Sequence, residues 1–546
     1  MGLCIDLVFG WNISLLIRER YWTKGGIKSM KPCKKALALL LMTVLTAAMA
    51  AGCKAKDQNN SSSGISENSQ VSENSGTGTG NNNKPTLYIF NSKGENAKEF
   101  EAMCEAYTAE TGVPTKPFSV GAGTDASEPL RAQMNSNTPP AIFSIMGVKE
   151  LPEWQQSGTA LDLTTVEDSE FKSIVEGIPE NMRLTTDGKA SYGIPFNVEG
   201  YGYMVDSQML DDLFGANSHE ALLKDLRTCS YEDFTKLCEA IDQYVATPSA
   251  AKVTVNGNEY TFQADKTGLA KNLTGVFAFA GSEKWTYGDH AINIAINTVF
   301  SSPIQAADAS DEQLDQLKEP FVAYAKMLDF VTQHVGGLKG HATRGRDLIN
   351  ASSFGYDQSI QMYADSNAVF LQQGNWASAN IGKVNQDVAN RSSFIPLKCP
   401  VTDDMIKTGK TAAEFNSSIP VYVPNYYAVN AKVSEEIQQE AINFLKWMQK
   451  TENVNKYIVG MFKAVPYNAS ENIEMEDALG SSIMSYVKEG RTLSDPYNGA
   501  PASWSSEVVG KQLMEQYLIK EQWSENDYSD IADFAISKWK EMKNAQ

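Results

Sequence analysis

Residues 86–120, TLYIFNSKGENAKEFEAMCEAYTAETGVPTKPFSV, decide the fold class of this chain. The segment begins with an apolar run at residues 86–91, which predicts a buried strand. The next apolar residues recur at helical spacing and predict a helix over residues 95–110; they are Phe100, Met103, Cys104 and Tyr107. Gly112 ends that helix, and a second strand is expected at residues 117–120.

The alternation of strand and helix continues toward the C-terminus. A helix is expected at residues 127–135 and a fully buried strand at residues 141–146. Strands separated by helices of this length indicate a parallel α/β sheet. Further elements are strands at 200–206, 368–372 and 425–430, a hairpin at 252–262, and helices at 230–241, 434–450 and 505–543. We expect the last helical region to be interrupted near Glu525.

The N-terminal part has the pattern of an export signal. Residues 30–53, MKPCKKALALLLMTVLTAAMAAGC, begin with lysines, continue as a short apolar run and end in small residues before Cys53. The apolar run is too short for a membrane span, which indicates a secretory signal peptide at residues 30–52. The residues before Cys53 resemble a bacterial lipobox, although Ala50 stands where a bulkier residue is usual. This resemblance implies lipid attachment at Cys53; the alternative is an ordinary signal with a chance cysteine.

Two segments flank this signal peptide. Residues 1–29 precede a complete signal, and the codons for residues 24–26 can spell a ribosome-binding site, so we expect translation to start at Met30. Residues 53–84 contain no aromatic side chain and bury too little apolar surface to fold. We expect them to form a lipid-anchored, disordered tether that spans roughly 30 Å root-mean-square.

Charge limits the classes of partner. The net charge is -19 at pH 7, and residues 1–52 hold seven basic against two acidic side chains, so the exported part is near -24. A nucleic-acid backbone or an anionic membrane face would be repelled by this charge. We therefore expect no nucleic-acid partner, and a neutral or cationic small ligand.

The cysteines of the folded part are too sparse for a disulfide framework. They are Cys104, Cys229, Cys238 and Cys399. Cys229 and Cys238 could pair, but they flank and enter one expected helix. This position favours free, buried thiols.

Several motifs follow one another in an order typical of one transport family. The opening strand and helix end in Glu110-Thr111-Gly112-Val113, and the later segments are TPPAIFSI at 138–145, DGKASYGIP at 187–195, ADSNAVFLQQGNW at 364–376 and the amphipathic helix within 429–452. Together they resemble the family 1 extracellular solute-binding proteins of bacterial ABC importers, of the carbohydrate-binding type. The resemblance covers nearly all of residues 86–543. One departure is Ala141, which follows Pro140 where the family usually has an aspartate.

The resemblance implies a periplasmic-binding-protein-like fold of class II type. Two α/β lobes are joined by hinge crossings, and the ligand cleft lies between them. The implied boundaries are 85–198 and 416–460 for lobe 1, and 199–415 and 461–546 for lobe 2. The implied function is capture of a sugar or oligosaccharide for a membrane permease, with no catalysis, cofactor or metal. We expect a lipid-anchored monomer on the extracellular face of the cell membrane, of the Gram-positive type.

A sugar site needs flat aromatic platforms for C–H faces and fixed polar groups for hydroxyls. Trp376 follows a strand and the flexible Gly374, and it matches the family's platform tryptophan. Trp504 matches a second platform late in the chain. Trp285 lies in a polar loop where a core residue is less natural. Core packing is the alternative for each of these tryptophans, and it is the preferred interpretation for Trp447.

Four further residues are candidates for the ligand site. Glu199 lies where the chain should cross between lobes, and its carboxylate could accept two sugar hydroxyls or be a solvated hinge residue. Tyr201 and Tyr203 point to the same side of a strand, so one could contact ligand while the other packs. Asp125 either caps the following helix or reaches the ligand.

Other functions have weaker support. Residues 121–126, GAGTDA, fit a dinucleotide-binding pattern, but Pro129 enters the short helix that follows. The four histidines have no neighbour at metal-ligand spacing, whereas the carboxylate pair of a glycosidase cannot be assessed from sequence. The alternative function is a secreted polysaccharide-active enzyme or a cell-wall carbohydrate adhesin. A peptide- or metal-binding receptor is disfavoured because the aromatic candidates lack basic or histidine companions in the sequence.

Overall fold

The computed structural model describes residues 84–121, 126–337, 344–468 and 475–545. The predicted leader, the signal peptide, Cys53 and almost all of the tether lie outside these ranges, as does Asp125. Within them, no helix combines the length and the apolar character that crossing a membrane requires.

The first sheet is mixed, with the strand order β2-β1-β3-β12-β4. Its strands are β1 (Leu87–Asn91), β2 (Thr115–Ser119), β3 (Ile142–Ile145), β4 (Ile194–Pro195) and β12 (Tyr426–Val429). The strands β1, β2 and β3 are parallel, as predicted, whereas β12 runs antiparallel to β3 and β4. β12 comes from a distant part of the chain, so the local alternation of strands and helices could not predict its direction.

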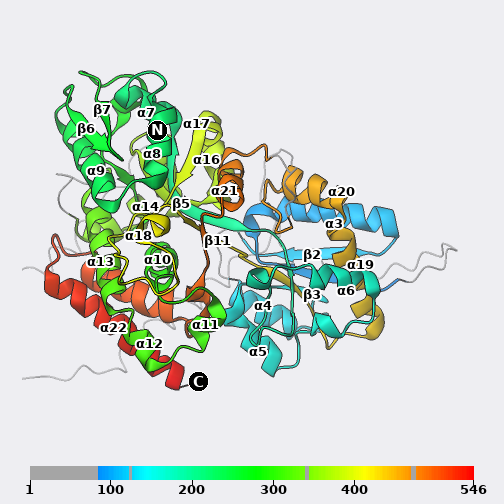
Figure 1. Ribbon diagram of the computed structural model, residues 1–546. Helices are drawn as coiled ribbons and strands as arrows, with labels where there is room; N and C mark the ends of the chain where they lie inside the picture. The colour runs from blue at the N-terminus through cyan, green and yellow to red at the C-terminus, as the bar shows by residue number, and fades with distance from the viewer. Residues whose placement is uncertain (1–83, 122–125, 338–343, 469–474, 546) are drawn as a thin grey trace, which may run out of the picture. The chain divides into compact units, whose positions relative to one another are not determined.

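Helices cover both faces of this sheet because adjacent strand residues point to opposite sides. Ile89 lies in a core with α3 (Ala97–Thr111), α6 (Ser169–Glu176) and α19 (Glu435–Met448). Its neighbour Phe90 lies in a second core with α4 (Ser127–Met134) and α5 (Leu151–Gln156). The helices predicted at 95–110 and 434–450 are thus confirmed, with ends shifted by one or two residues (Figure 1).

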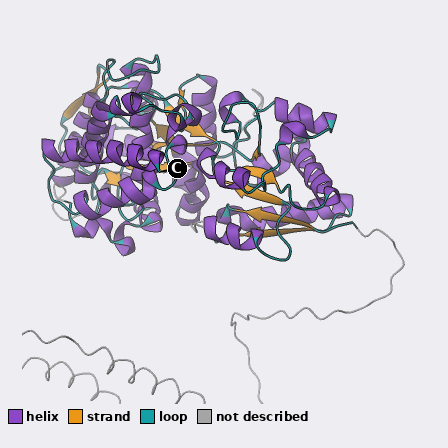
Figure 2. Ribbon diagram, turned by 90° about the horizontal axis from the view of Figure 1, so that it is seen from below, coloured by secondary structure: helices purple, strands orange, loops and turns teal. Residues whose placement is uncertain are grey.

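The second sheet is centred on β5 (Glu199–Asp206), whose eight residues are all buried. The strand order is β13-β11-β5-β9-β8, and β10 also pairs with β5. The other strands are β8 (Phe277–Ala278), β9 (Phe370–Gly374), β10 (Ser392–Ile395), β11 (Ile419–Tyr422) and β13 (Thr492–Leu493). Figure 2 shows the strands of both sheets lying between helices.

The chain passes between the two sheets through short adjacent segments. Residues 196–198 connect β4 to β5, and residues 423–425 connect β11 to β12. The two segments are hydrogen-bonded to each other, since the Phe196 N–H donates to the Asn425 carbonyl oxygen at 3.3 Å. Val198 also donates to the carbonyl of Val465 at 2.8 Å. The strand β11 pairs with β5 and so belongs to the second sheet, although it lies within the range 416–460 expected for lobe 1. The next strand that belongs to the first sheet is β12.

Helices complete the second sheet's core. They include α9 (Tyr231–Ala246), α13 (Lys318–Gln333) and α22 (Glu525–Asn544), and α22 packs on α13. The predicted interruption of the C-terminal helical region is present. It ends at Ser524, whose side chain forms a capping box with Asp527 at the start of α22. The hairpin of β6 (Lys252–Val255) and β7 (Asn258–Thr261) forms around Asn256-Gly257 as predicted.

All four cysteines of the described residues are free and buried, as expected for thiols that pack in the core. Burial raises the pKa of Cys238 well above its ordinary value, and the same cause raises the pKa of Cys229. Both side chains are therefore neutral thiols at physiological pH.

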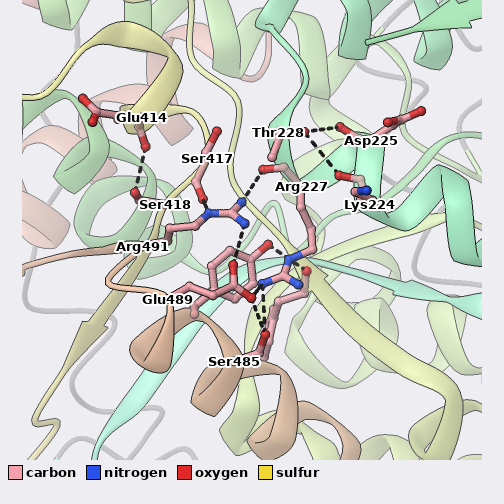
Figure 3. A network of polar contacts seen from close by, with 12 residues as sticks. Lys224, Asp225, Arg227, Thr228, Glu414, Ser417, Ser418, Ser485, Glu489 and Arg491 are labelled. Atoms are coloured by element: carbon pink, nitrogen blue, oxygen red, sulfur yellow. Dashed lines mark hydrogen bonds and ion pairs between the residues drawn. The ribbon is translucent and has the colours of Figure 1, made fainter. Parts of the chain in front are cut away.

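A polar network fixes β11 against neighbouring helices (Figure 3). Arg491 donates to the carbonyl oxygens of Ser417 and Arg227, both at 2.9 Å, and to the Glu489 carboxylate at 2.7 Å. The guanidinium carbons of Arg227 and Arg491 lie 4.2 and 5.1 Å from the centroid of the Tyr486 ring. The backbone of Arg491 accepts a hydrogen bond from Ile419, the first residue of β11.

We expect Arg491→Lys to lower the free energy of unfolding by about 1–3 kcal/mol, because one ammonium cannot reach both carbonyls. Urea denaturation followed by circular dichroism measures the change. The control is Lys252→Met, which removes an exposed pair with Glu259 and should cost less than about 1 kcal/mol. Equal losses in both variants would contradict the role given to Arg491.

Candidate ligand-binding site

An aromatic cluster surrounds His290 near the crossing segments. Its members besides His290 are Tyr201, Trp285, Trp376, Tyr422 and Tyr497. The His290 ring is stacked on Tyr201 at a centroid distance of 4.4 Å. The rings of Trp285 and Trp376 each lie 5.2 Å from it at steeper angles. The structure thus brings together three of the predicted site residues, Trp376, Trp285 and Tyr201.

Trp376 is positioned by the end of β9. It lies in the turn Asn375–Ala377, and its indole N–H donates to the Gln373 side-chain oxygen at 3.1 Å. The indole folds back over Gly374, where a Cβ atom would lie 2.0 Å from the Trp376 ring. Glycine is therefore required at this position for the ring's orientation. The side chain of Trp376 remains partly exposed, so part of its surface is available for contact.

The π-helical segment Thr286–Ala291 positions Trp285 and His290. Trp285 is its N-cap residue and remains partly exposed, with its indole N–H donating to Glu283 at 3.3 Å. Within the segment, the Asp289 carboxylate accepts a hydrogen bond from Ser505. Segments of this geometry occur frequently at functional sites.

The two predicted tyrosines differ in their surroundings. The Tyr201 hydroxyl donates to the His290 carbonyl at 3.0 Å and accepts from Asn293 at 2.9 Å, so this fully buried ring is fixed beneath the cluster. Tyr203 is stacked on Phe234 at 5.4 Å and is 1% exposed. Its position is that of a core residue of the second sheet.

Trp504 lies apart from the cluster, in the helical core. It is 0% exposed, its indole N–H donates to the Ala535 carbonyl at 2.8 Å, and its ring lies 4.5 Å from that of Trp539. An indole enclosed in this way offers no face to a ligand, so the structure favours the core-packing alternative for Trp504.

Glu199 is the first residue of β5 and forms an ion pair with a lysine that follows β1. The Nζ atom of Lys93 lies 2.8 Å from the Glu199 carboxylate, and the two side chains are 13% and 6% exposed. Asn197 also donates to this carboxylate at 3.5 Å. Burial raises the pKa of Glu199 more strongly than the charge of Lys93 lowers it. The pair therefore connects the first sheet to the start of the second sheet's central strand.

Several buried polar atoms beside this ion pair and the cluster have no hydrogen-bond partner within the described residues. They are the Ser92 hydroxyl, the Asn197 side-chain oxygen and the Gln373 side-chain nitrogen. Ser92 precedes Lys93, Asn197 is two residues before Glu199, and Gln373 holds the indole of Trp376. Buried polar groups cost free energy unless they are hydrogen-bonded. A bound polyhydroxylated molecule or water could satisfy such groups.

The sequence matches a known family over most of its length. The family model described as bacterial extracellular solute-binding protein matches residues 102–474. The chain belongs to this family. No relative among curated proteins matches the sequence.

Solved structures of other solute-binding proteins share the fold. A chitin oligosaccharide binding protein has a TM-score of 0.55 at 14% identity, covering 85% of this chain and 100% of its own. The solute-binding protein RafE in complex with raffinose has a TM-score of 0.56 at 15% identity, covering 84% and 99%. A Streptococcus pneumoniae solute-binding protein in complex with the blood group A-trisaccharide has a TM-score of 0.54 at 15% identity, covering 83% and 100%. At these identities the likeness establishes the two-lobed α/β fold.

The electrostatic surroundings of the cluster in this solute-binding protein include two half-buried carboxyl groups. Burial raises the pKa of Asp495 to about 7, and burial likewise raises the pKa of Asp289. Lys149, which follows β3, lies with its Nζ atom 5.4 Å from the Tyr497 ring centroid and opposes both shifts. Contacts from the ends of β1 and β3 thus converge on elements of the second sheet.

Sequence reasoning missed Lys93, Lys149, His290, Tyr422 and Tyr497. The expectation that the aromatic candidates lack basic or histidine companions was wrong: His290 lies five residues after Trp285, and Lys149 comes from a segment distant from both indoles in sequence. One signal was available for the two lysines. Each follows the carboxyl end of a parallel strand, which is where ligand sites of α/β sheets usually lie. For His290 the available signal was its position five residues after Trp285, whereas no local pattern distinguishes the two tyrosines.

We expect Lys93→Met to lower the free energy of unfolding by about 3–5 kcal/mol at neutral pH, because Glu199 is left buried without its cation. A raised carboxyl pKa means that the folded protein binds the proton more tightly than the unfolded chain, so stability falls as pH rises. The stability difference between the wild type and Lys93→Met should therefore shrink as pH falls toward 4.5, the ordinary pKa of this carboxyl, because Glu199 becomes protonated and neutral. Urea denaturation across this pH range measures it.

The double variant Lys93→Met with Glu199→Gln is the matched control, since it removes both charges. It should recover much of the lost stability and show little of the pH dependence. A single variant that is as stable as the wild type at pH 7 would contradict the proposed pairing.

Proposed function

We propose that this solute-binding protein captures a saccharide at the aromatic cluster and delivers it to the permease of an ABC importer. The observation that carries the proposal is the combination of partly exposed indoles with buried, unpartnered polar atoms beside them. Indole faces match the C–H surfaces of a sugar ring, and the polar atoms match its hydroxyl groups. The proteins of the same fold that are named above for chitin oligosaccharide, raffinose and A-trisaccharide support this ligand class.

Binding is coupled to the arrangement of the lobes in this proposal. Lys93 and Lys149 follow strands of the first sheet, whereas Trp376, Tyr422 and His290 belong to segments around the second sheet. A ligand that contacts both groups favours the conformation in which they are close, and it shifts the population of lobe arrangements toward that state. The ligand-bound state then docks on the permease, as the family's transport role requires.

A binding function without catalysis accounts for the chemistry of the site. The Glu199 carboxylate is paired with Lys93. The His290 side chain is uncharged at neutral pH, because burial lowers its pKa to about 3. The structural relatives described above are binding proteins. We therefore propose that the saccharide is recovered intact after binding.

We expect Trp376→Ala to weaken saccharide binding at least about tenfold, because the loss of one aromatic platform removes on the order of 1.5 kcal/mol or more. Isothermal titration calorimetry with raffinose, chitin oligosaccharides and xylo-oligosaccharides measures affinity. Wild-type protein at a ligand concentration of about 100 Kd should gain about 2.7 kcal/mol of stability, seen as a rise in melting temperature.

The control for this variant is Trp447→Phe. Trp447 packs on Tyr107 and donates to Glu110 in the core of the first sheet, so its replacement should lower stability and leave affinity unchanged. Affinity that falls equally in both variants would argue against ligand stacking on Trp376. Release of a shortened sugar would instead favour a polysaccharide-active enzyme.

We also propose that the protein is held at the extracellular face of the cell membrane by a lipid on Cys53. The support is the signal-like segment at residues 30–53 and the exported nature of the family. Mass analysis of protein from membranes should show an acylated Cys53 as the first residue. Cys53→Ala should abolish acylation, whereas Cys104→Ala, a core substitution, should not. An unmodified N-terminus at or before residue 52 in membrane-bound protein would contradict this assignment.

A further inference from the structure

The ring nitrogens of His290 take part in no side-chain hydrogen bond within the described part of the chain. The side chain is 8% exposed, and the hydrogen bond from Tyr201 goes to the backbone carbonyl rather than to the ring. The other two histidines in the described ranges bind carboxylates: His219 Nδ1 lies 2.8 Å from Asp211, and His334 Nδ1 lies 3.2 Å from Asp242. The ring nitrogens of His290, unlike those of the other two histidines, are therefore available for a hydrogen bond with a ligand.

Contacts from several elements fix the His290 ring in place. Tyr201 stacks beneath it and also donates to the His290 carbonyl, so ring and backbone are held by one tyrosine. The adjacent residue Asp289 is held by Ser505, which fixes the π-helical segment against the C-terminal helices. The two partly exposed indoles, Trp285 and Trp376, lie on other sides of the ring.

The charge state of the ring suits an uncharged ligand. Burial, with the nearby cations Lys149 and Lys93, lowers the pKa of His290 to about 3. A neutral imidazole offers one N–H donor and one acceptor nitrogen. A sugar hydroxyl can accept from the first or donate to the second, whereas a metal ion would require further ligands. No group of three metal-binding side chains occurs within the residues that the structure describes.

We infer that His290 is a ligand-binding residue that forms a hydrogen bond with one hydroxyl of a saccharide bound against Trp285 and Trp376, whose rings contact each other at a centroid distance of 6.3 Å. The inference rests on the proposed saccharide-binding function and extends it by naming a residue that selects among sugars. The imidazole forms a directional hydrogen bond, and the indoles provide the apolar contact surface. A sugar that lacks the hydroxyl at this point leaves the imidazole unpaired and binds more weakly.

The test combines a protein variant with deoxy ligands. His290→Phe keeps a ring that can stack on Tyr201 but removes both nitrogens. The saccharide with the lowest Kd among raffinose, chitin oligosaccharides and xylo-oligosaccharides is titrated into wild type and variant by calorimetry. We expect the variant to bind about tenfold more weakly, a factor typical of a hydrogen bond lost to a buried group.

Singly deoxygenated analogues of that saccharide then identify the hydroxyl. One analogue should bind wild type about tenfold more weakly than the parent sugar yet bind His290→Phe as well as the parent does. A merely structural role would weaken all analogues by the same factor, and this outcome would overturn the inference. The control His334→Phe, which replaces a histidine whose ring lies tilted at a centroid distance of 4.6 Å from Phe330, should leave every affinity unchanged.

The possible failures are distinguishable. Wild-type protein that binds none of the saccharides would overturn the proposed function and this inference with it. Saccharide binding that is unaffected in His290→Phe would overturn only the role of His290. Thermal melting of each variant without ligand separates a loss of folding from a loss of affinity, and His290→Gln, which keeps a donor and an acceptor, should lose less affinity than His290→Phe.

Discussion

The pairing of β11 with β5 is the constraint on which the site depends. Tyr422 lies opposite Glu199 in this antiparallel pair, at the point where both strands meet the crossing segments. The register therefore places an aromatic ring and a buried carboxylate side by side at the junction of the two sheets. Neither could move by one residue without turning its side chain to the opposite face.

This constraint explains why the site is built from distant segments. Tyr201 lies two residues beyond Glu199 on β5 and points to the same face, where it supports His290. Trp376 is brought to the same place by β9, whose Gly374 lies opposite Tyr201 in the ladder. The network of Arg491 holds the other side of β11. The ring arrangement is thus a consequence of strand register rather than of any local motif.

The fold class and the positions of most helices and strands could be predicted from sequence because they depend on local periodicity. Phe100, Met103, Cys104 and Tyr107 recur at helical spacing, and all four are buried on one face of α3. The strands β1 and β3 were expected for the same reason. The antiparallel position of β12 was not, since strand direction depends on which distant segment arrives beside β3.

The sequence by itself predicted an α/β solute-binding protein and named Trp376, Trp285 and Glu199 among its candidate site residues. Apolar spacing, turn residues and charge are properties of neighbouring residues, and they survive without tertiary contacts. Only the tertiary structure decided that Trp504 packs in the core, that Lys93 pairs with Glu199, and that His290 lies among the indoles. The burial and the partners of these side chains depend on contacts between residues far apart in sequence. His290 and Tyr201, for example, are 89 residues apart, and local sequence carries no record of such a contact.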